Sequence, residues 1–487
     1  MQAAEPGSHA ARARTATRVT LTARAAQTAI GVGALAVLAR LVPPEDFGLV
    51  AMATVFTGIA ANLNDYGLPV AISQRDEFTP TTRAALTRWH RRHNARIIGA
   101  LLLISPILAW FYGRVEVLYV TPALAVGTFA QGLSAIPTGV LRRGLRFPAL
   151  MGAQVAANAL SSAAAIALAW RGADLWALIA QLVGLQILTA VALHALTRSR
   201  PLADAGGAEH AGGEASPDLQ RFGTHLTAAK FLRLAARRVD QLLIGRLAGA
   251  EALGLYQQAY KWAWFPQKQI TAPLLGVNVA DLSRLRPMSP ADDPLPYRRQ
   301  ARVTQQTVYA CLLPVLTGLH LEAERVIRLL LGDQWDAAVP LFRLLLVFVV
   351  VYTPLQLLKQ VYYTEGRSAE YLRWSVWEAG GLAVAAAAGA LAGPESVALA
   401  LAVAAAALTV IAIPRACRGS VLTPADLLMP IAAPAVAAAV AAAAAMRHRE
   451  PARWAALEVA PAFETAIAFL SVYAVAFALA TARRRAL

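Results

Sequence analysis

Long apolar runs dominate this sequence and constrain its fold more than any other feature. Most runs are about 17–25 residues long, the length at which a helix crosses a hydrocarbon core about 30 Å thick. Of the 487 residues, 57% are hydrophobic and only 15% are charged, whereas a soluble globular chain is about a quarter charged. The sequence therefore predicts an all-α polytopic membrane protein.

About fourteen spans can be assigned. Twelve form two sets of six, and two more follow toward the carboxyl terminus. The predicted ranges are 25–42, 47–71, 96–112, 119–140, 148–170 and 173–196, then 223–246, 252–279, 303–321, 337–363, 370–392 and 396–414, and finally 424–446 and 460–481.

The net charge of +16 is compatible with nucleic-acid binding or with membrane topology. Arginine gathers in every second loop, and the loops between them, such as VPPED at 42–46, are short and poor in arginine. This is the positive-inside pattern, so we expect no nucleic-acid partner and cytoplasmic amino and carboxyl termini. The tract Trp89–His93 lies in such an inner loop and is interpreted as a headgroup-facing surface. With fourteen spans, the basic loop Arg447–Trp454 lies on the outer side of the membrane, which disagrees with the positive-inside pattern. Either the last hairpin is misassigned or late loops follow this pattern less closely.

One phrase occurs twice. LARLVPPEDFGLV (Leu38–Val50) recurs as IGRLAGAEALGLY (Ile244–Tyr256). Each copy ends the first helix of a six-span set and begins the second, with an acidic residue in the new first turn. The five matches share one offset of 206 positions and are Arg40 with Arg246, Leu41 with Leu247, Glu45 with Glu251, Gly48 with Gly254, and Leu49 with Leu255.

The shared offset favours a duplication over a generic outer turn that arose twice. Six spans separate the copies, so both sets have the same orientation, as in transporters built from parallel repeats around a central cavity. A second, weaker similarity links two segments that each join the fourth and fifth spans of their set. They are RRGLRF (Arg142–Phe147) and EGRSAEYLR (Glu365–Arg373). The predicted organisation is a cytoplasmic segment at 1–24, an N-lobe at 25–196, a cytoplasmic linker at 197–222, a C-lobe at 223–415 and an additional transmembrane hairpin at 416–487.

Cations fall within the spans that open the second set. Lys230, Arg233 and Arg237 share one face of a helix with Gln241. Each central cation costs roughly 2.5–3.5 kcal/mol in lipid, so this face is expected to line a protein interior or a water-filled cavity. The alternative is that the residues near the inner helix ends extend to the headgroups. The same alternative applies to Lys261 and Lys268 in the next span, and to Arg24, which the repeat places opposite Lys230.

A cavity lined by Lys and Arg suits an anion such as pyrophosphate. We expect its polar and aromatic lining to include Gln241, Gln257, Trp264, Asn64 and Tyr66. Three acidic residues are candidates for ion coupling, namely Asp65, Asp240 and Glu378. The chain contains no phosphate loop, HExxH, nucleophile elbow or CxxC motif, and its two cysteines cannot form a metal site. We therefore expect no metal, no cofactor and no catalytic residues.

Several phrases together resemble the Wzx-type polysaccharide flippases, in the lipopolysaccharide and colanic-acid exporter branch of the polysaccharide transport family. They are LARLVPPEDFGLVAMATVF, NDYGLPVAISQR, LRRGLRF, VDQLLIGRLAGAEALGLYQQAYKW and RLLLGDQWDAAVPLFRLL. The family lies in the multidrug/oligosaccharidyl-lipid/polysaccharide exporter superfamily. The resemblance covers roughly residues 20 to 415.

This resemblance implies two six-helix lobes around a V-shaped cavity in the bacterial cytoplasmic membrane. It implies alternating access for an undecaprenyl-pyrophosphate-linked oligosaccharide, moved from the inner to the outer leaflet. Membrane lipids and polysaccharide-assembly proteins are the expected partners. Basic cavity residues hold the lipid carrier in the family, and Lys230, Arg233 and Arg237 occupy the matching helix. The alternatives are a multidrug or cation antiporter of the same superfamily, which needs deep acidic groups, and a membrane glycosyltransferase or polymerase, which needs larger outer loops.

Overall fold

The computed structural model describes residues 6–65, 68–69, 72, 79–198, 238–286, 293–447 and 470–475. Within these ranges every regular element is a helix, so the predicted all-α class is confirmed. The chain divides into two compact units, Met1–Gly254 and Leu255–Leu487, and each is described by itself.

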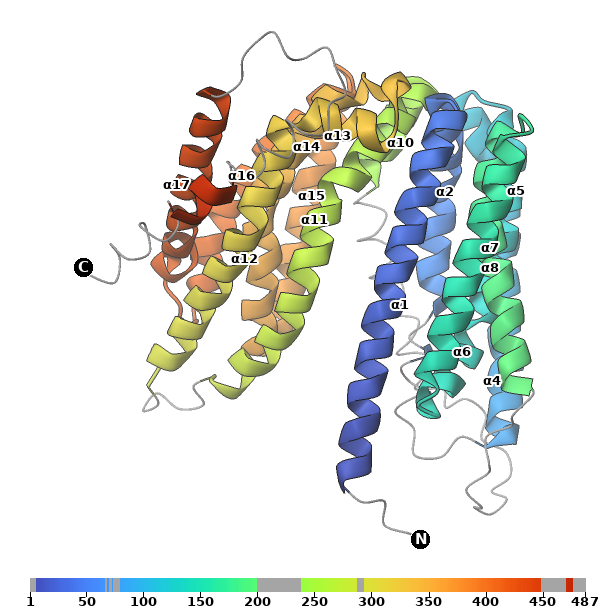
Figure 1. Cartoon of the computed structure of the whole chain (residues 1–487), viewed down its shortest axis with the longest axis horizontal. Helices are drawn as coiled ribbons and strands as arrows, with labels where there is room; N and C mark the ends of the chain where they lie inside the picture. Colours follow the sequence, from blue (N-terminus) through green and yellow to red (C-terminus); the bar gives the residue numbers. More distant parts are fainter. Residues whose placement is uncertain are drawn as a thin grey trace. The chain divides into compact units, whose positions relative to one another are not determined.

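The first unit is a bundle of long helices. In it α7 packs on α1 and α8, and α5 packs on α2, α4 and α8 (Figure 1). Pro44, Pro80 and Pro148 stand in the first turns of three helices, where a missing N–H costs nothing. The helices are α1 (Pro6–Leu41), α2 (Pro44–Asp65), α4 (Pro80–Tyr112), α5 (Glu116–Leu133), α6 (Ala135–Arg143), α7 (Phe147–Ala169), α8 (Asp174–Arg198) and α10 (Val239–Leu247), followed by the start of α11 (Gly249–Arg284).

The second unit contains most of α11 and the remaining helices. Here α14 and α15 pack on α16, and α12 packs on α17. The short segment 470–475 is helical, and the hydroxyl of Tyr473 donates to the carbonyl of Ala310 at 3.0 Å. The helices are α12 (Leu295–Leu321), α13 (Ala323–Leu330), η1 (Asp333–Trp335), α14 (Ala338–Thr364), α15 (Ser368–Ala390), α16 (Pro394–Cys417) and α17 (Pro424–Arg447).

Eight helices of the described ranges are long and apolar enough to cross a membrane. Large apolar side chains on them are exposed, among them Trp110 (81%) and Leu103 (79%), as expected where lipid covers the surface. This is a multi-pass membrane protein, while the number of fourteen spans stays a prediction. The eight segments are Arg18–Leu41, Pro80–Tyr112, Glu116–Arg143, Phe147–Ala169, Asp174–Arg198, Ala338–Thr364, Pro394–Cys417 and Pro424–Met446.

Several helices are longer than the apolar runs that predicted them. The first helix begins at Pro6 rather than near 25, and α4 begins at Pro80 rather than near 96. Hydropathy reports only the lipid-crossing part of a helix, and a helix can continue through polar residues because its hydrogen bonds lie within the segment. Residues 197 and 198 of the predicted linker form the end of α8. The rest of that linker, 199–222, and most of the spans at 223–246 and 460–481 lie outside the described residues.

The tract Trp89–His93 is part of α4, and the interpretation of all of it as an exposed surface was wrong. His90 is 1% exposed, and its Nε2 lies 2.8 Å from the carbonyl oxygen of Gly132. One turn later Asn94 donates to the carbonyl of Phe129 at 2.8 Å. These two contacts hold the end of α5 against α4, and the end of α5 is where the candidate site begins.

Candidate functional site

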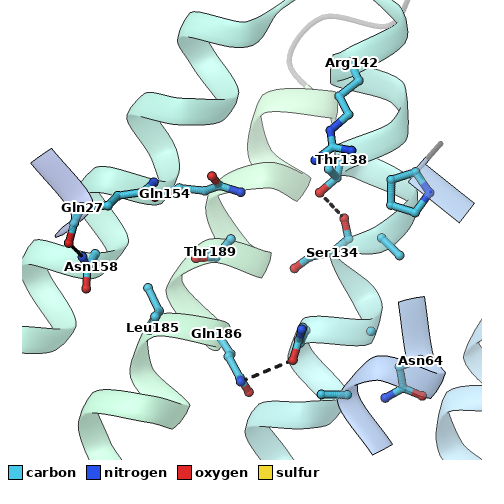
Figure 2. Close-up of a pocket in the computed structure, with 15 residues that line it drawn as sticks. Gln27, Asn64, Ser134, Thr138, Arg142, Gln154, Asn158, Leu185, Gln186 and Thr189 are labelled. Atoms are coloured by element: carbon cyan, nitrogen blue, oxygen red, sulfur yellow. Dashed lines mark hydrogen bonds between the residues drawn. The ribbon is translucent and has the colours of Figure 1, made fainter. Parts of the chain in front are cut away.

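A pocket of about 580 Å³ lies among the helices of the first unit. Its lining is polar but almost uncharged, with six amides, three hydroxyls, one cation and no carboxylate among fifteen residues. The lining comes mostly from α1, α2, α5, α6, α7 and α8 and comprises Gln27, Ala61, Asn64, Pro69, Gln131, Gly132, Ser134, Ala135, Thr138, Arg142, Gln154, Asn158, Leu185, Gln186 and Thr189 (Figure 2). We call it the amide pocket.

Small residues at the junction of two helices line one side of the pocket. Helix α5 ends at Leu133 and α6 begins at Ala135, with Ser134 alone between them. The small residues Gly132, Ser134 and Ala135 line the pocket there. A Cβ at Gly132 would lie 2.4 Å from Nδ2 of Asn94, so glycine is required where α5 meets α4. The longer amide side chains of α1, α7 and α8 extend into the volume that these small residues leave.

Asn64 is the most deeply buried polar residue of the lining. It is 1% exposed, and its Nδ2 makes one long hydrogen bond of 3.4 Å to the carbonyl of Thr128. Its Oδ1 is buried and has no hydrogen-bond partner among the residues that the structure describes. A buried amide oxygen without a donor costs free energy, and a ligand with a hydroxyl or N–H group in the pocket would supply that donor.

The other amides are only partly paired. Gln186 donates to Oε1 of Gln131 over 3.4 Å, and Asn158 donates to the backbone carbonyl of Gln27 over 3.0 Å. Figure 2 shows Gln154 reaching from α7 toward the middle of the pocket. Within the described residues, the side chains of Gln154 and Thr189 make no hydrogen bond. The pocket thus presents several donors and acceptors to whatever occupies it.

Half of the predicted cationic set lies outside the described residues, namely Lys230, Arg233 and Arg237, and so does Tyr66. Arg24 on α1 is exposed, one turn from Gln27 of the pocket. Lys261 and Lys268 are exposed on α11, while Gln257 is half-buried on the same helix. The role of these cations in substrate binding stays a prediction.

The remaining predicted residues occupy separate places. Trp264 is buried in the second unit, with ring centroids 5.8 Å from Phe348 and 5.5 Å from Tyr352, so it packs as core. Glu378 is 2% exposed and accepts a hydrogen bond from Tyr352. The predicted Asp65 is the last residue of α2.

At the start of α10, Gln241 is buried and accepts a hydrogen bond of 2.7 Å from Arg238. The Oδ1 of Asp240, also buried, accepts from the backbone N–H of Gln241 at 2.8 Å. Of the predicted substrate-binding residues that the structure describes, Asn64 alone lies in the amide pocket.

Most of the pocket was missed from the sequence. The signal was available, since Gln131, Gln154, Asn158 and Gln186 are amides within otherwise apolar spans. Such groups are costly in lipid and mark packing or a site. The predicted binding site relied on charged residues instead. The four amides lie on three different helices, and the sequence does not reveal how these helices pack.

Solved structures of two membrane transporters have a fold similar to that of this chain. The chain resembles the lipid II flippase MurJ in an inward closed conformation, with a TM-score of 0.66 at 13% identity, over 97% of this chain and all of that one. It also resembles an inward-facing multidrug resistance MATE transporter of the MOP superfamily, with a TM-score of 0.62 at 13% identity, over 81% of this chain and 94% of that one. The chain therefore shares its fold with these two solved structures.

Sequence comparison identifies the family. Residues 37–340 match the family model described as polysaccharide biosynthesis protein, and the chain belongs to that family. It is 25% identical to the teichuronic acid biosynthesis protein TuaB of Bacillus subtilis, over 66% of this chain and 64% of that protein. The succinoglycan biosynthesis transport protein ExoT of Rhizobium meliloti is 23% identical, over 77% and 74%.

The lipopolysaccharide biosynthesis protein WzxC of Escherichia coli is 22% identical, over 65% of this chain and 63% of that protein. The chain thus spans slightly less than two thirds of TuaB and WzxC. These matches confirm the resemblance to the polysaccharide transport family that the five quoted phrases indicated.

Proposed function

We propose that this protein is a flippase that moves an undecaprenyl-pyrophosphate-linked oligosaccharide from the inner to the outer leaflet of the bacterial cytoplasmic membrane. The observation that carries this proposal is the amide pocket, a polar volume of about 580 Å³ within a unit of apolar helices. Family membership and the names of the relatives, which concern teichuronic acid, succinoglycan and lipopolysaccharide, support a glycan-bearing substrate.

The substrate has two chemically different parts. Its oligosaccharide needs hydrogen bonds, and its pyrophosphate needs cations. Lys261 and Lys268 are exposed on a helix otherwise rich in apolar and aromatic residues, and lipid would not tolerate their ammonium groups. We assign them, with Lys230, Arg233, Arg237 and Arg24, to the path of the pyrophosphate.

In this proposal the protein alternates between states open to each side, with amino and carboxyl termini in the cytoplasm. It acts as a transporter rather than an enzyme, and proteins of polysaccharide assembly receive its product. A cation antiporter is less well supported, because the fifteen residues that line the pocket include no Asp or Glu.

Depletion in a bacterium that carries the gene tests the proposal. The lipid-linked oligosaccharide should accumulate where an impermeant glycosidase cannot reach it in intact spheroplasts. Export of a cationic dye, measured in the same cells, should not change. Unchanged amounts and sidedness of the lipid-linked oligosaccharide, with a loss of dye export, would contradict the proposal and favour the antiporter.

A further inference from the structure

The lining of the amide pocket is matched to one kind of ligand. Six of its residues carry an amide and three carry a hydroxyl, whereas Arg142 is the sole charged residue among the fifteen. A pyrophosphate is bound in proteins by several cations or by a row of backbone N–H groups, and a single guanidinium at one end of the pocket is a poor match. The lining therefore does not suit the charged part of a lipid carrier.

Amides and hydroxyls suit a polyhydroxylated ligand. Each amide offers two donor hydrogens and an acceptor oxygen, and each sugar hydroxyl offers one donor and two acceptor sites. The pocket volume lies in the range of about 300–1,000 Å³ that is typical of small-molecule sites. Asn64 is 1% exposed, and its Oδ1 has no hydrogen-bond partner within the described part of the chain. A sugar hydroxyl would supply the missing donor.

The arrangement of the amides also favours a ligand over mutual pairing. Polar side chains within membrane helices usually hydrogen-bond across to one another. Here the one amide–amide contact, Gln186 to Gln131, is long at 3.4 Å. Gln154 and Thr189 line the pocket and make no side-chain hydrogen bond within the described residues. These groups keep their hydrogen-bonding capacity for the occupant.

We infer that the amide pocket binds uncharged sugar residues of the substrate and that it is separate from the site that binds the pyrophosphate. This inference rests on the proposed function for the identity of the lipid-linked substrate. The pocket then selects the glycan, because amides of α7 and α8 hydrogen-bond to hydroxyl groups at particular positions. Cations outside the pocket bind the pyrophosphate carrier that is common to all substrates.

Binding to the purified full-length protein in lipid nanodiscs tests the inference with two probes. One is undecaprenyl pyrophosphate carrying the oligosaccharide, isolated from producing cells, and the other is undecaprenyl pyrophosphate without sugar. The variants are Gln154→Leu and Gln186→Leu. The matched control is Gln181→Leu, an amide on α8 that lies outside the pocket and donates to Ser162 at 3.5 Å. Thr189→Val is nearly isosteric and serves if a leucine variant does not fold.

We expect the wild-type protein to bind the sugar-bearing probe at least about tenfold more tightly than the sugar-free probe. Each pocket variant should lose roughly tenfold for the sugar-bearing probe alone, because an amide lost from a satisfied pair leaves a buried group unpaired. The control should match the wild type. Equal wild-type affinity for both probes, or an equal loss for both probes in the pocket variants, would overturn the inference. Transport measured in parallel separates the claims, since a protein that binds sugar through the pocket without moving the lipid would refute only the proposed function.

Discussion

Gly48 on α2 and Gly254 on α11 lie close together in the first unit. A Cβ built at Gly48 would lie 1.7 Å from the carbonyl oxygen of Ala250, and a Cβ at Gly254 would lie 2.0 Å from the carbonyl oxygen of Pro44. Pro44 and Ala250 are separated by the same 206 positions as the two glycines. The contact is therefore reciprocal: each copy of the repeated phrase places its glycine against the helix start of the other copy.

Such reciprocity is what a two-fold relationship between two copies produces. Glycine lets the two backbones approach closely, as small residues do in membrane helix pairs. The contact lies within the first unit, and the parallel repeat of two six-helix lobes stays a prediction.

Gly48→Ala and Gly254→Ala should each destabilise the protein, by about 1–3 kcal/mol, because the added methyl group must push two backbones apart. Thermal unfolding of the purified variants in detergent measures the effect as a lower midpoint. Gly58→Ala is the matched control on α2, since a Cβ at Gly58 meets no atom within 4 Å. Midpoints for Gly48→Ala and Gly254→Ala as high as that of Gly58→Ala would rule out the close contact.

The turn before α7 holds a leucine in a conformation that favours glycine. Leu145 has φ 51°, and Gly366 has φ 73° in the corresponding turn before α15. The next residues, Arg146 and Arg367, cap the two helices with nearly the same angles, φ −83° with ψ 45° and φ −87° with ψ 45°. Because Leu145 is exposed, Leu145→Gly should stabilise the protein by about 0.5–1 kcal/mol.

The reverse substitution, Gly366→Ala, should destabilise the protein by about 1 kcal/mol, since an alanine takes on the strain that Leu145 bears. Both effects are measured as shifts of the unfolding midpoint of the full chain. A lower midpoint for Leu145→Gly would show that its side chain contributes more than its backbone costs.

Arg367 joins the start of α15 to the end of α16. Its guanidinium donates to the carbonyls of Ala416 and Arg418, both at 2.7 Å, and to Glu370 at 2.6 Å. It lies 5.2 Å from the ring centre of Tyr362. Arg367→Ala should cost about 3 kcal/mol, because two carbonyls and the carboxylate of Glu370 lose their donor.

Arg367→Lys should also lower the stability of the protein, because one ammonium group cannot present the planar set of donors that these partners share. Unfolding midpoints compare Arg367→Ala and Arg367→Lys with Arg373→Ala, a change of an exposed arginine on the same helix. A midpoint for Arg367→Lys equal to that of the wild type would argue against the geometric role.

Asp46 in the first turn of α2 makes stability depend on pH. Burial, together with the charges of Asp174, Glu45 and Glu116, raises the pKa of Asp46 to about 6. An unfolded aspartate has a pKa of about 3.9, so between these values the folded protein holds more protons than the unfolded chain. Stability should therefore fall as pH rises from about 4 to 6.

Asp46→Asn removes this titration. The difference between the unfolding midpoints at pH 4.5 and pH 7.5 should be smaller in Asp46→Asn than in the wild type, with a higher midpoint than the wild type at pH 7.5. The same pH difference in both proteins would assign the effect to other carboxylates.

The sequence predicted what the bilayer itself dictates. Apolar runs predicted the helices, because a segment of about twenty apolar residues is stable in lipid as an α-helix. The offset between Gly48 and Gly254 marked two positions that the structure brings into contact. The extension of α4 back to Pro80 could not be read from hydropathy, since its polar amino-terminal turns carry no apolar signal.

The amide pocket depends on packing, which a single sequence does not encode locally. Gln131 and Gln186 are 55 positions apart and meet only because α5 packs on α8. Asn64 was predicted as part of a polar lining for its place at a helix end, and its unpartnered Oδ1 became visible only with its neighbours in place. Within apolar spans, uncharged polar residues are therefore as informative about a binding site as charged residues.

Reconstitution tests the flippase proposal most directly. Liposomes that contain the purified protein would carry undecaprenyl-pyrophosphate-linked oligosaccharide in both leaflets, and an impermeant glycosidase would report the fraction exposed outside. We predict that digestion proceeds beyond about half of the glycan, the share expected for the outer leaflet alone, and that it does so faster than in protein-free liposomes. Digestion that stops at the same level with and without the protein would contradict the proposed function.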